Sequence, residues 1–238
     1  MLSNWDISVS QEDNLLRFRE ENIFGKASRS RVEDILEIFK QRYLGNEHVI
    51  ISLLHFSNVN VSGQILDPIL YFLSAQSDQL LHDTVTEILF AFQEEGRVDV
   101  SVNDLSTILL KWQAEGKIKG EWSDTTRKRV SKGLLATLRD FGILKGIRKK
   151  KIAPILLPTA SFAFISYYLL KDKKKAIDSL QDPEWRLFFL SSLAVERFFM
   201  EAHQLELLQY HAAGNIIRIE FPVESIEEYA QYVIERSN

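Results

Sequence analysis

The sequence predicts a mostly α-helical protein in which helical bundles flank a central winged helix-turn-helix with a small β-wing. Apolar residues recur at spacings of three and four through most of the 238-residue chain, which is typical of amphipathic helices. Near the middle, two such helices precede two short apolar segments that a basic tip separates. Helix, helix, strand, basic tip and strand is the element order of a winged helix. We therefore expect three domains, residues 1–80, 81–158 and 159–238.

The first domain, residues 1–80, is expected to be a helical bundle. In residues 31–44 the apolar side chains fall on one face, and Ser28 or Ser30 is placed to cap the start. The same periodicity recurs in residues 47–56, 65–74 and 80–92. Because each of these helices has a single apolar face, none is stable alone, and the pattern predicts that they pack together.

The central domain, residues 81–158, carries the predicted winged helix-turn-helix. Ser123 is expected to cap its last helix and Gly142 to close it. The expected helices cover about residues 82–95, 103–114 and 124–141. The extended pieces are expected at residues 98–100, 143–144 and 152–158, with a hairpin-like tip at residues 146–151 between the last two.

The third domain, residues 159–238, is expected to be helical with one short strand. Alternating β-branched residues predict the strand at residues 215–221. Helices are expected at about residues 159–170, at 184–208 with a possible break, and at 225–236.

The uncharged stretch 152–170 resembles a short membrane span, because lysine clusters flank its 19 residues on both sides. Pro154, Pro158 and several hydroxyl side chains argue against a span. The stretch divides better into a buried strand and a core helix that begins at Thr159. We therefore expect no membrane partner.

Composition is that of an ordinary globular protein, with 45% hydrophobic and 26% charged residues and a net charge of −4, which excludes a disordered or fibrous chain. The absence of cysteine excludes disulfides, thiolate nucleophiles, Cys-ligated zinc and iron–sulfur clusters. The first residues lack the basic and apolar regions of a secretory signal. These observations favour a cytoplasmic protein.

The net charge conceals two opposed regions. Residues 117–151 hold twelve basic and three acidic residues, a net charge of +9, whereas the remaining residues carry a net charge of −13. A basic block in an acidic protein indicates a polyanionic partner. A solvated basic helix face that binds no nucleic acid is the simplest alternative.

If residues 124–141 form a recognition helix, its first two turns carry most of the exposed cations. Arg pairs well with guanine edges, and Lys and Thr more often meet phosphates. The candidate DNA-binding residues are Thr125, Thr126, Arg127, Lys128, Arg129 and Lys132 on the helix, and Arg148, Lys149, Lys150 and Lys151 at the tip. If about six of these cations neutralise phosphates, log affinity should fall with log salt at a slope of roughly −5.

A second, weaker candidate patch precedes the helix at residues 31–44. It consists of Lys26, Arg29 and Arg31 near a helix N-terminus, where free backbone N–H groups also favour phosphate. A plain helix–loop–helix corner, with Gly25 supplying the turn, explains the same residues equally well.

Catalytic and metal-binding patterns are poor. No metalloprotease, nucleophile-elbow or dinucleotide-binding motif occurs. His48 and His55 are seven residues apart and share a helix face, but ordinary structural roles are expected for both. We therefore expect no enzyme, no catalytic residue, no metal and no cofactor.

Several segments together resemble the BrxA family, accessory proteins of the BREX bacteriophage-exclusion systems. The resemblance covers most of the chain and rests on diffuse motifs: Glu21-Asn22-Ile23-Phe24-Gly25-Lys26, Ser28-Arg29-Ser30-Arg31, Arg42-Tyr43-Leu44, Asp67-Pro68-Ile69-Leu70, Ser123-Asp124-Thr125-Thr126-Arg127-Lys128 and Phe141-Gly142-Ile143-Leu144. It implies a helical, non-enzymatic protein that binds DNA beside BREX methyltransferase, phosphatase-like and ATPase components. It supplies no catalytic residue.

The sequence thus predicts a double-stranded DNA-binding protein of a BREX system that contacts mainly phosphates, with other BREX components as partners. Two alternatives stay open. One is a protein–protein adaptor whose basic block only balances charge. The other is an RNA-binding helical protein resembling antitermination factors.

Overall fold

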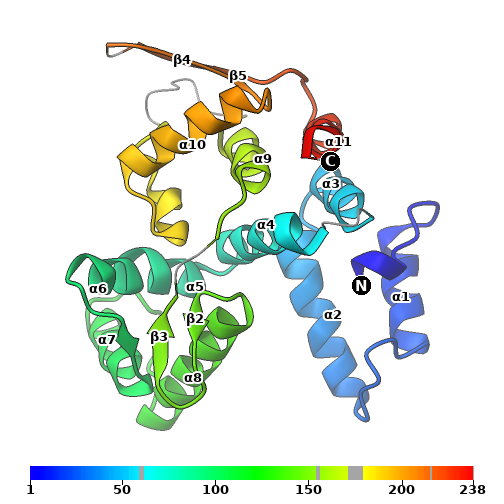
Figure 1. The fold of residues 1–238 in the computed structure, drawn as a ribbon. Coiled ribbons are helices and arrows are strands. Elements are labelled where there is room, and N and C mark those ends of the chain that lie inside the picture. The colour runs from blue at the N-terminus through cyan, green and yellow to red at the C-terminus, as the bar shows by residue number, and fades with distance from the viewer. Residues whose placement is uncertain (59–61, 154–155, 171–178, 215, 238) are drawn as a thin grey trace. The chain divides into compact units, whose positions relative to one another are not determined.

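The computed structural model describes residues 1–58, 62–153, 156–170, 179–214 and 216–237, and it is mostly helical (Figure 1). The predicted helical class is therefore confirmed. The chain divides into two compact units. Unit 1 comprises Met1–Gln79, Leu157–Trp185 and Leu190–Asn238, and unit 2 comprises Leu80–Leu156 and Arg186–Phe189.

Unit 1 combines the first and the last helices of the chain. Its N-terminal elements are the 3-10 helix η1 (Leu2–Asn4), α1 (Gln11–Glu20), α2 (Arg29–Tyr43), α3 (Glu47–Ser57) and α4 (Ser62–Ser77). Its later elements are α9 (Thr159–Leu170), the start of the 3-10 helix η4 (Pro183–Phe188), α10 (Ser192–Gln204), β4 (Gln209–Ala213), β5 (Ile216–Glu220) and α11 (Ile226–Ser237).

The core of unit 1 joins α3 to α11, two helices that are far apart in the sequence. His48 and His55 lie on the face of α3 that meets α11. His48 pairs with Glu227, and His55 Nε2 lies 3.0 Å from Gln231 Nε2. Because both imidazoles join helices, the structural role expected for them agrees with their contacts.

Helix α9 is the buried centre of unit 1. Every side chain from Ala160 to Tyr167 is buried, and Ser161 Oγ donates a hydrogen bond to the Ile65 carbonyl at 2.7 Å. The helix begins at Thr159, as predicted. In the part of the chain that the structure describes, no helix is both long and apolar enough to cross a membrane.

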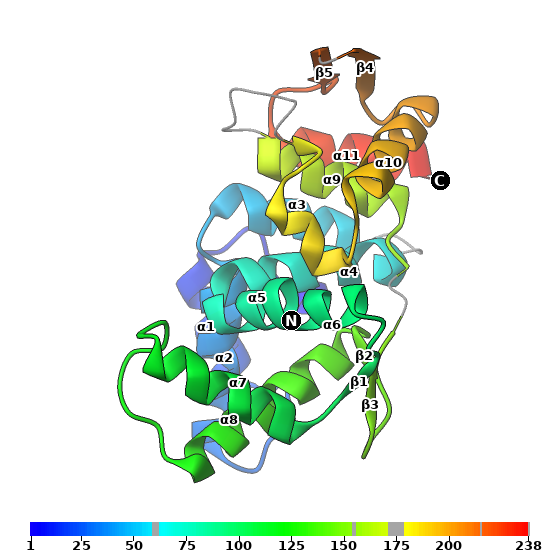
Figure 2. The ribbon, with the colours of Figure 1, turned by 90° about the vertical axis from the view of Figure 1, so that its left-hand side faces the viewer.

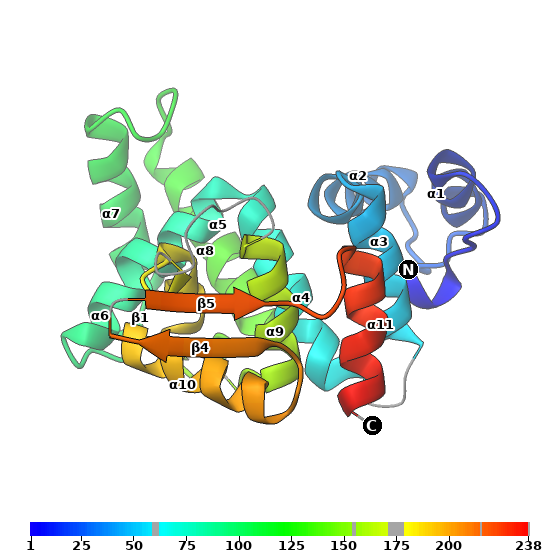
Figure 3. The same cartoon turned by 90° about the horizontal axis from the view of Figure 1, so that it is seen from above.

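A two-stranded antiparallel hairpin, β4 and β5, precedes α11 (Figure 3). The predicted strand is confirmed as β5. Its partner β4 is a second strand, which the sequence did not predict. The expected break in the long helix is also present, because η4 ends at Phe188 and α10 begins at Ser192.

In its described residues, unit 2 consists of a continuous first helix with a π-helical middle, two further helices and a three-stranded sheet (Figure 2). Its elements are α5 (Gln79–Asp83), the π-helix η2 (Thr84–Leu89), α6 (Phe90–Glu94), β1 (Asp99–Val100), α7 (Val102–Ala114), α8 (Asp124–Asp140), β2 (Leu144–Lys145) and β3 (Lys150–Ile152). The antiparallel strands lie in the order β1-β3-β2.

The last strand of unit 2 differs from the expected one. Residues 152–158 were expected to be extended, whereas β3 begins at Lys150 and ends at Ile152. Residues 154–155 lie outside the described part of the chain. The shift places Lys150 and Lys151 in the sheet, where β3 pairs with both of its neighbours, rather than in the connecting tip.

Candidate nucleic-acid interface

Helix α8 starts at a well-formed cap. Ser123 Oγ accepts a hydrogen bond from the Thr126 backbone N–H at 3.2 Å, and its distance to Thr126 Oγ1 is 3.0 Å. The cap satisfies one of the free N–H groups of the first turn. Thr126, a candidate DNA-binding residue, therefore takes part in the cap in this structure.

The buried and exposed faces of α8 separate as its periodicity predicts. Ser131, Leu134, Leu135 and Leu138 are buried. The exposed residues Thr125, Lys128, Arg129 and Lys132 follow one another at spacings of three, one and three. Residues three and four apart share a helix face, so these four side chains form one exposed stripe along the first half of α8. We call them the α8 stripe.

Arg127 does not belong to the α8 stripe. Its side chain is only 13% exposed, and its guanidinium donates to the Trp122 carbonyl just before the helix. Its Nη2 atom also lies 3.7 Å from Asp124 Oδ1. This arginine holds the connection into α8, a position that a count of basic residues does not reveal.

Among the described residues, the α8 stripe forms an ion pair with Asp124. Asp124 Oδ2 lies 2.8 Å from Lys128 Nζ, one helical turn away. The hydrogen bond from Lys128 is the main reason that the pKa of Asp124 is lowered. Both side chains are about half exposed, so water and salt weaken this pair. Lys128 can therefore exchange Asp124 for another anion.

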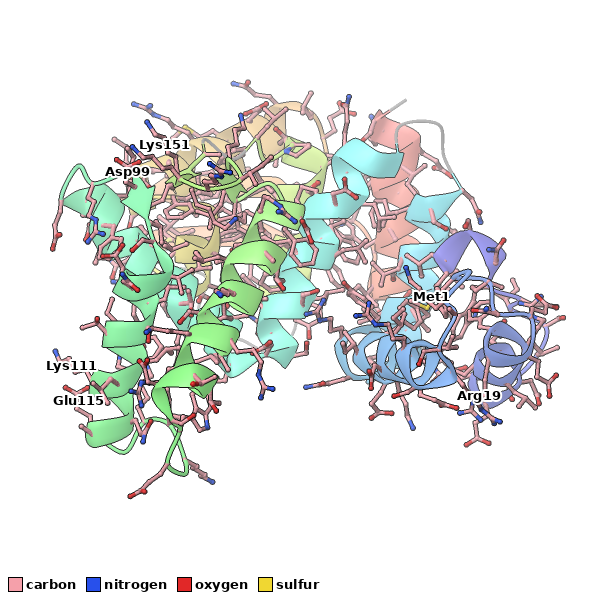
Figure 4. The ribbon with its side chains drawn as sticks, turned by 90° about the horizontal axis from the view of Figure 1, so that it is seen from below. Met1, Arg19, Asp99, Lys111, Glu115 and Lys151 are labelled. Atoms are coloured by element: carbon pink, nitrogen blue, oxygen red, sulfur yellow. The ribbon has the colours of Figure 1, made fainter. Side chains whose placement is uncertain are left out.

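The β2–β3 connection carries the second group of cations. Arg148 and Lys149 lie in the loop and are exposed, whereas Lys150 is half-buried and its Nζ donates to the Ile147 carbonyl at 3.4 Å. Lys151 lies opposite Asp99 on β1, and Figure 4 labels the two residues side by side. Three of the four predicted tip residues are therefore exposed.

Lys145 belongs to the same group of cations, although it is not among the residues predicted from the sequence. It lies on β2 directly opposite Lys151 and is exposed. Two like charges at facing positions of a ladder repel each other. This pair therefore adds positive potential at the β2 edge of the sheet, and Asp99 lies on the other side of Lys151. The signal that could have found it is register: antiparallel strands around a short basic loop place cations opposite one another.

Lys117, another cation of the basic region 117–151, also has a structural role. Its Nζ lies 2.9 Å from Asp83 Oδ2, pairs with Glu87 and sits 4.2 Å from the centre of the Trp112 ring. Burial acts to lower the pKa of Lys117, but its bonds to Glu87 and Asp83 outweigh burial and raise it. This cation fastens the end of α7 to the first helix of unit 2.

The weaker patch in unit 1 lies beside a cavity of about 510 Å³. Lys26 and Arg29 line the cavity together with Arg19, whereas Arg31 is exposed and does not line it. Glu33 Oε2 lies 2.8 Å from Arg19 Nη2, and Glu33 Oε1 lies 3.7 Å from Arg29 Nε. A single carboxylate thus serves two of the arginines around this cavity.

Ser28 stands at the cap position of α2, but its side chain makes no cap hydrogen bond. The loop before it is closed instead by Asn22, whose side chain accepts from the N–H of Lys26 at 3.1 Å and donates to its carbonyl at 2.8 Å.

Within the described residues, no group of three or more His, Asp or Glu side chains could hold a metal ion.

Comparison with known proteins gives one result. The model of the BrxA family matches residues 2–167, which include all of unit 2 except Arg186–Phe189 and end within α9. The searches of curated proteins and of solved structures each returned no match. Because the match covers more than half of the chain, the protein belongs to the BrxA family, which implies a BREX-associated role in defence against bacteriophages.

Proposed function

We propose that this protein binds double-stranded DNA through unit 2, which acts as a winged helix. In this proposal α8 is the recognition helix and the β2–β3 hairpin is the wing. The observation that supports it most is the coincidence of two features: the sheet order β1-β3-β2 beside α7 and α8, and the unburied α8 stripe. In a winged helix these are the elements that meet the major groove and the adjacent backbone.

The side chains favour contacts to phosphates over reading of bases. Lys128 and Lys132 are flexible point charges suited to phosphates. The Thr125 hydroxyl is suited to donate a hydrogen bond to a phosphate oxygen. Arg129 is the one member of the α8 stripe whose fork can pair with a guanine edge. We therefore expect tight but weakly sequence-selective binding.

The proposed role follows from binding and family together. The protein would bring duplex DNA to other BREX components in the cytoplasm, and it would act without catalysis, metal or cofactor of its own. The remaining alternatives, an adaptor without DNA binding and an RNA-binding protein, are outcomes of the experiment below.

The test is the affinity of the purified full chain for a fluorescent duplex, measured by anisotropy. The double substitution Lys128→Glu/Lys132→Glu reverses two charges of the α8 stripe. Each lost phosphate contact costs about tenfold in affinity near 0.1 M salt, so we expect the variant to bind at least about a hundredfold more weakly than the wild type.

The matched control is Lys111→Glu/Lys119→Glu, which reverses the same number of exposed charges in unit 2 outside the α8 stripe. It should lose far less affinity. Equal affinity of the wild type and the Lys128→Glu/Lys132→Glu variant would contradict the proposal. Preference for structured RNA over duplex DNA in a competition assay would favour the RNA-binding alternative.

A further inference from the structure

The β2–β3 connection exposes one large apolar side chain among its cations. Ile147 is 84% exposed, and it is the second of the four residues that join the two strands. Exposed apolar surface is unfavourable in water. A partner that covers an isoleucine at such a position therefore lowers the free energy of the system.

The backbone of the connection holds Ile147 in this place. Gly146 has a φ of +97°, a conformation that L-residues rarely adopt, and a Cβ there would collide with the Lys149 carbonyl oxygen. Lys150 Nζ also donates to the Ile147 carbonyl at 3.4 Å. The turn thus needs a glycine before Ile147, and the side chain projects from a constrained loop.

The surroundings of Ile147 indicate the chemistry of its partner. No acidic residue occurs between Phe141 and Ala153, and Lys145, Arg148 and Lys149 are exposed around the isoleucine. A single apolar side chain ringed by cations matches a groove with a row of anions on each edge, in which sugar walls and the faces of unstacked bases offer apolar surface. The minor groove of DNA has this form: phosphates line both edges, and base and sugar surfaces lie between them.

We propose that Ile147 is a wedge that enters the minor groove of the bound duplex and partly unstacks one base step. This inference rests on the proposed DNA binding and adds the mode of contact. Apolar side chains are used in this way by proteins that kink DNA. The step opened should be a flexible pyrimidine–purine step such as TA, so duplexes that contain TA steps should bind better than those without them.

A membrane surface is the competing partner for an apolar residue among cations. Interfacial binding requires a broad apolar face as well as cations, and here one exposed isoleucine lies in a four-residue connection beside the exposed cations Lys145, Arg148 and Lys149. The observations therefore favour the narrow groove of a duplex.

The test measures base unstacking directly. Duplexes with several TA steps carry 2-aminopurine in place of adenine, and the full-length protein is added at saturating concentration. Wild type should raise the 2-aminopurine fluorescence. Ile147→Ala should abolish the rise and weaken binding about three- to tenfold, with an unchanged salt dependence because no charge is lost. Ile147→Leu, which keeps an apolar side chain, should retain the signal.

The matched control is Ile216→Ala on β5, which removes the same side chain from another position that is 74% exposed. It should leave both the fluorescence and the affinity unchanged. If the wild type binds the duplex without a fluorescence change, or Ile147→Ala matches the wild type, the wedge is wrong while DNA binding stands. Failure of the wild type to bind any duplex would overturn both proposals. Binding to anionic phosphatidylserine vesicles that Ile147→Ala abolishes, without unstacking of DNA, would assign the tip to membranes.

Discussion

Two clusters of cations lie near helix N-termini, and their carboxylates distinguish them. Among the described residues, the α8 stripe in unit 2 pairs with Asp124 through Lys128, and Arg129 and Lys132 are exposed. In unit 1, Glu33 lies between Arg19 and Arg29 and pairs with both. Similar densities of basic residues therefore give different surfaces.

This difference teaches that the placement of acidic residues decides which cations can meet an anionic partner. Arg29 loses part of its positive potential to a carboxylate one helical turn away. Lys151 lies between Asp99 on β1 and Lys145 on β2, so Lys145, on the edge strand, faces a cation in the ladder. Exposed ion pairs are weak, but DNA must still displace them. Substitutions in the two clusters can therefore break or sharpen the comparison.

The largest effect in this series is expected at the sheet. Lys145→Gln removes one cation of the facing pair and should weaken duplex binding about five- to tenfold near 0.1 M salt. The same change relieves a like-charge repulsion, so the free energy of unfolding should rise by a few tenths of a kcal/mol. Anisotropy and thermal melts measure the two quantities. A parallel loss of affinity and stability would show that Lys145 has only a structural role.

A smaller effect of opposite sign is expected at the start of α8. Asp124→Asn removes the carboxylate that pairs with Lys128, while an asparagine at this position keeps the size of the side chain. Duplex affinity should increase about two- to threefold, because Lys128 no longer has to leave the Asp124 carboxylate in order to bind a phosphate. A decrease in the affinity of the folded variant would mean that Asp124 orients Lys128 for binding.

The smallest effect is expected in unit 1. Lys26→Gln/Arg29→Gln removes two cations, the same number as in the α8 variant, yet duplex affinity should fall less than about twofold. Circular dichroism confirms that the variant is folded. A loss of tenfold or more would make the loop before α2 a second DNA contact and would end the contrast between the two clusters.

Local signals in the sequence were sufficient for much of the fold. Ser123 and the apolar periodicity placed α8 correctly, and Thr159 marked the start of α9 after a proline. The alternating residues of β5 were equally clear. Each of these features depends on a few neighbouring residues, which is why periodicity and caps predict them.

The remaining features depend on distant residues. Nothing in α3 or α11 alone indicates that His48 will meet Glu227, because that contact arises from the tertiary fold. Strand β4 has a weak β pattern of its own and is paired along its full length with β5. Arg127 was predicted with the other cations, but the free carbonyl of Trp122 determines where its guanidinium lies.

The most direct test of the central proposal is the salt dependence of duplex binding by the wild-type full chain. If unit 2 neutralises about six phosphates, log affinity should fall with log salt at a slope of roughly −5. In the Lys128→Glu/Lys132→Glu variant the slope should be shallower by about 2. A wild-type slope near zero, or the same slope in both proteins, would contradict DNA binding through the α8 stripe.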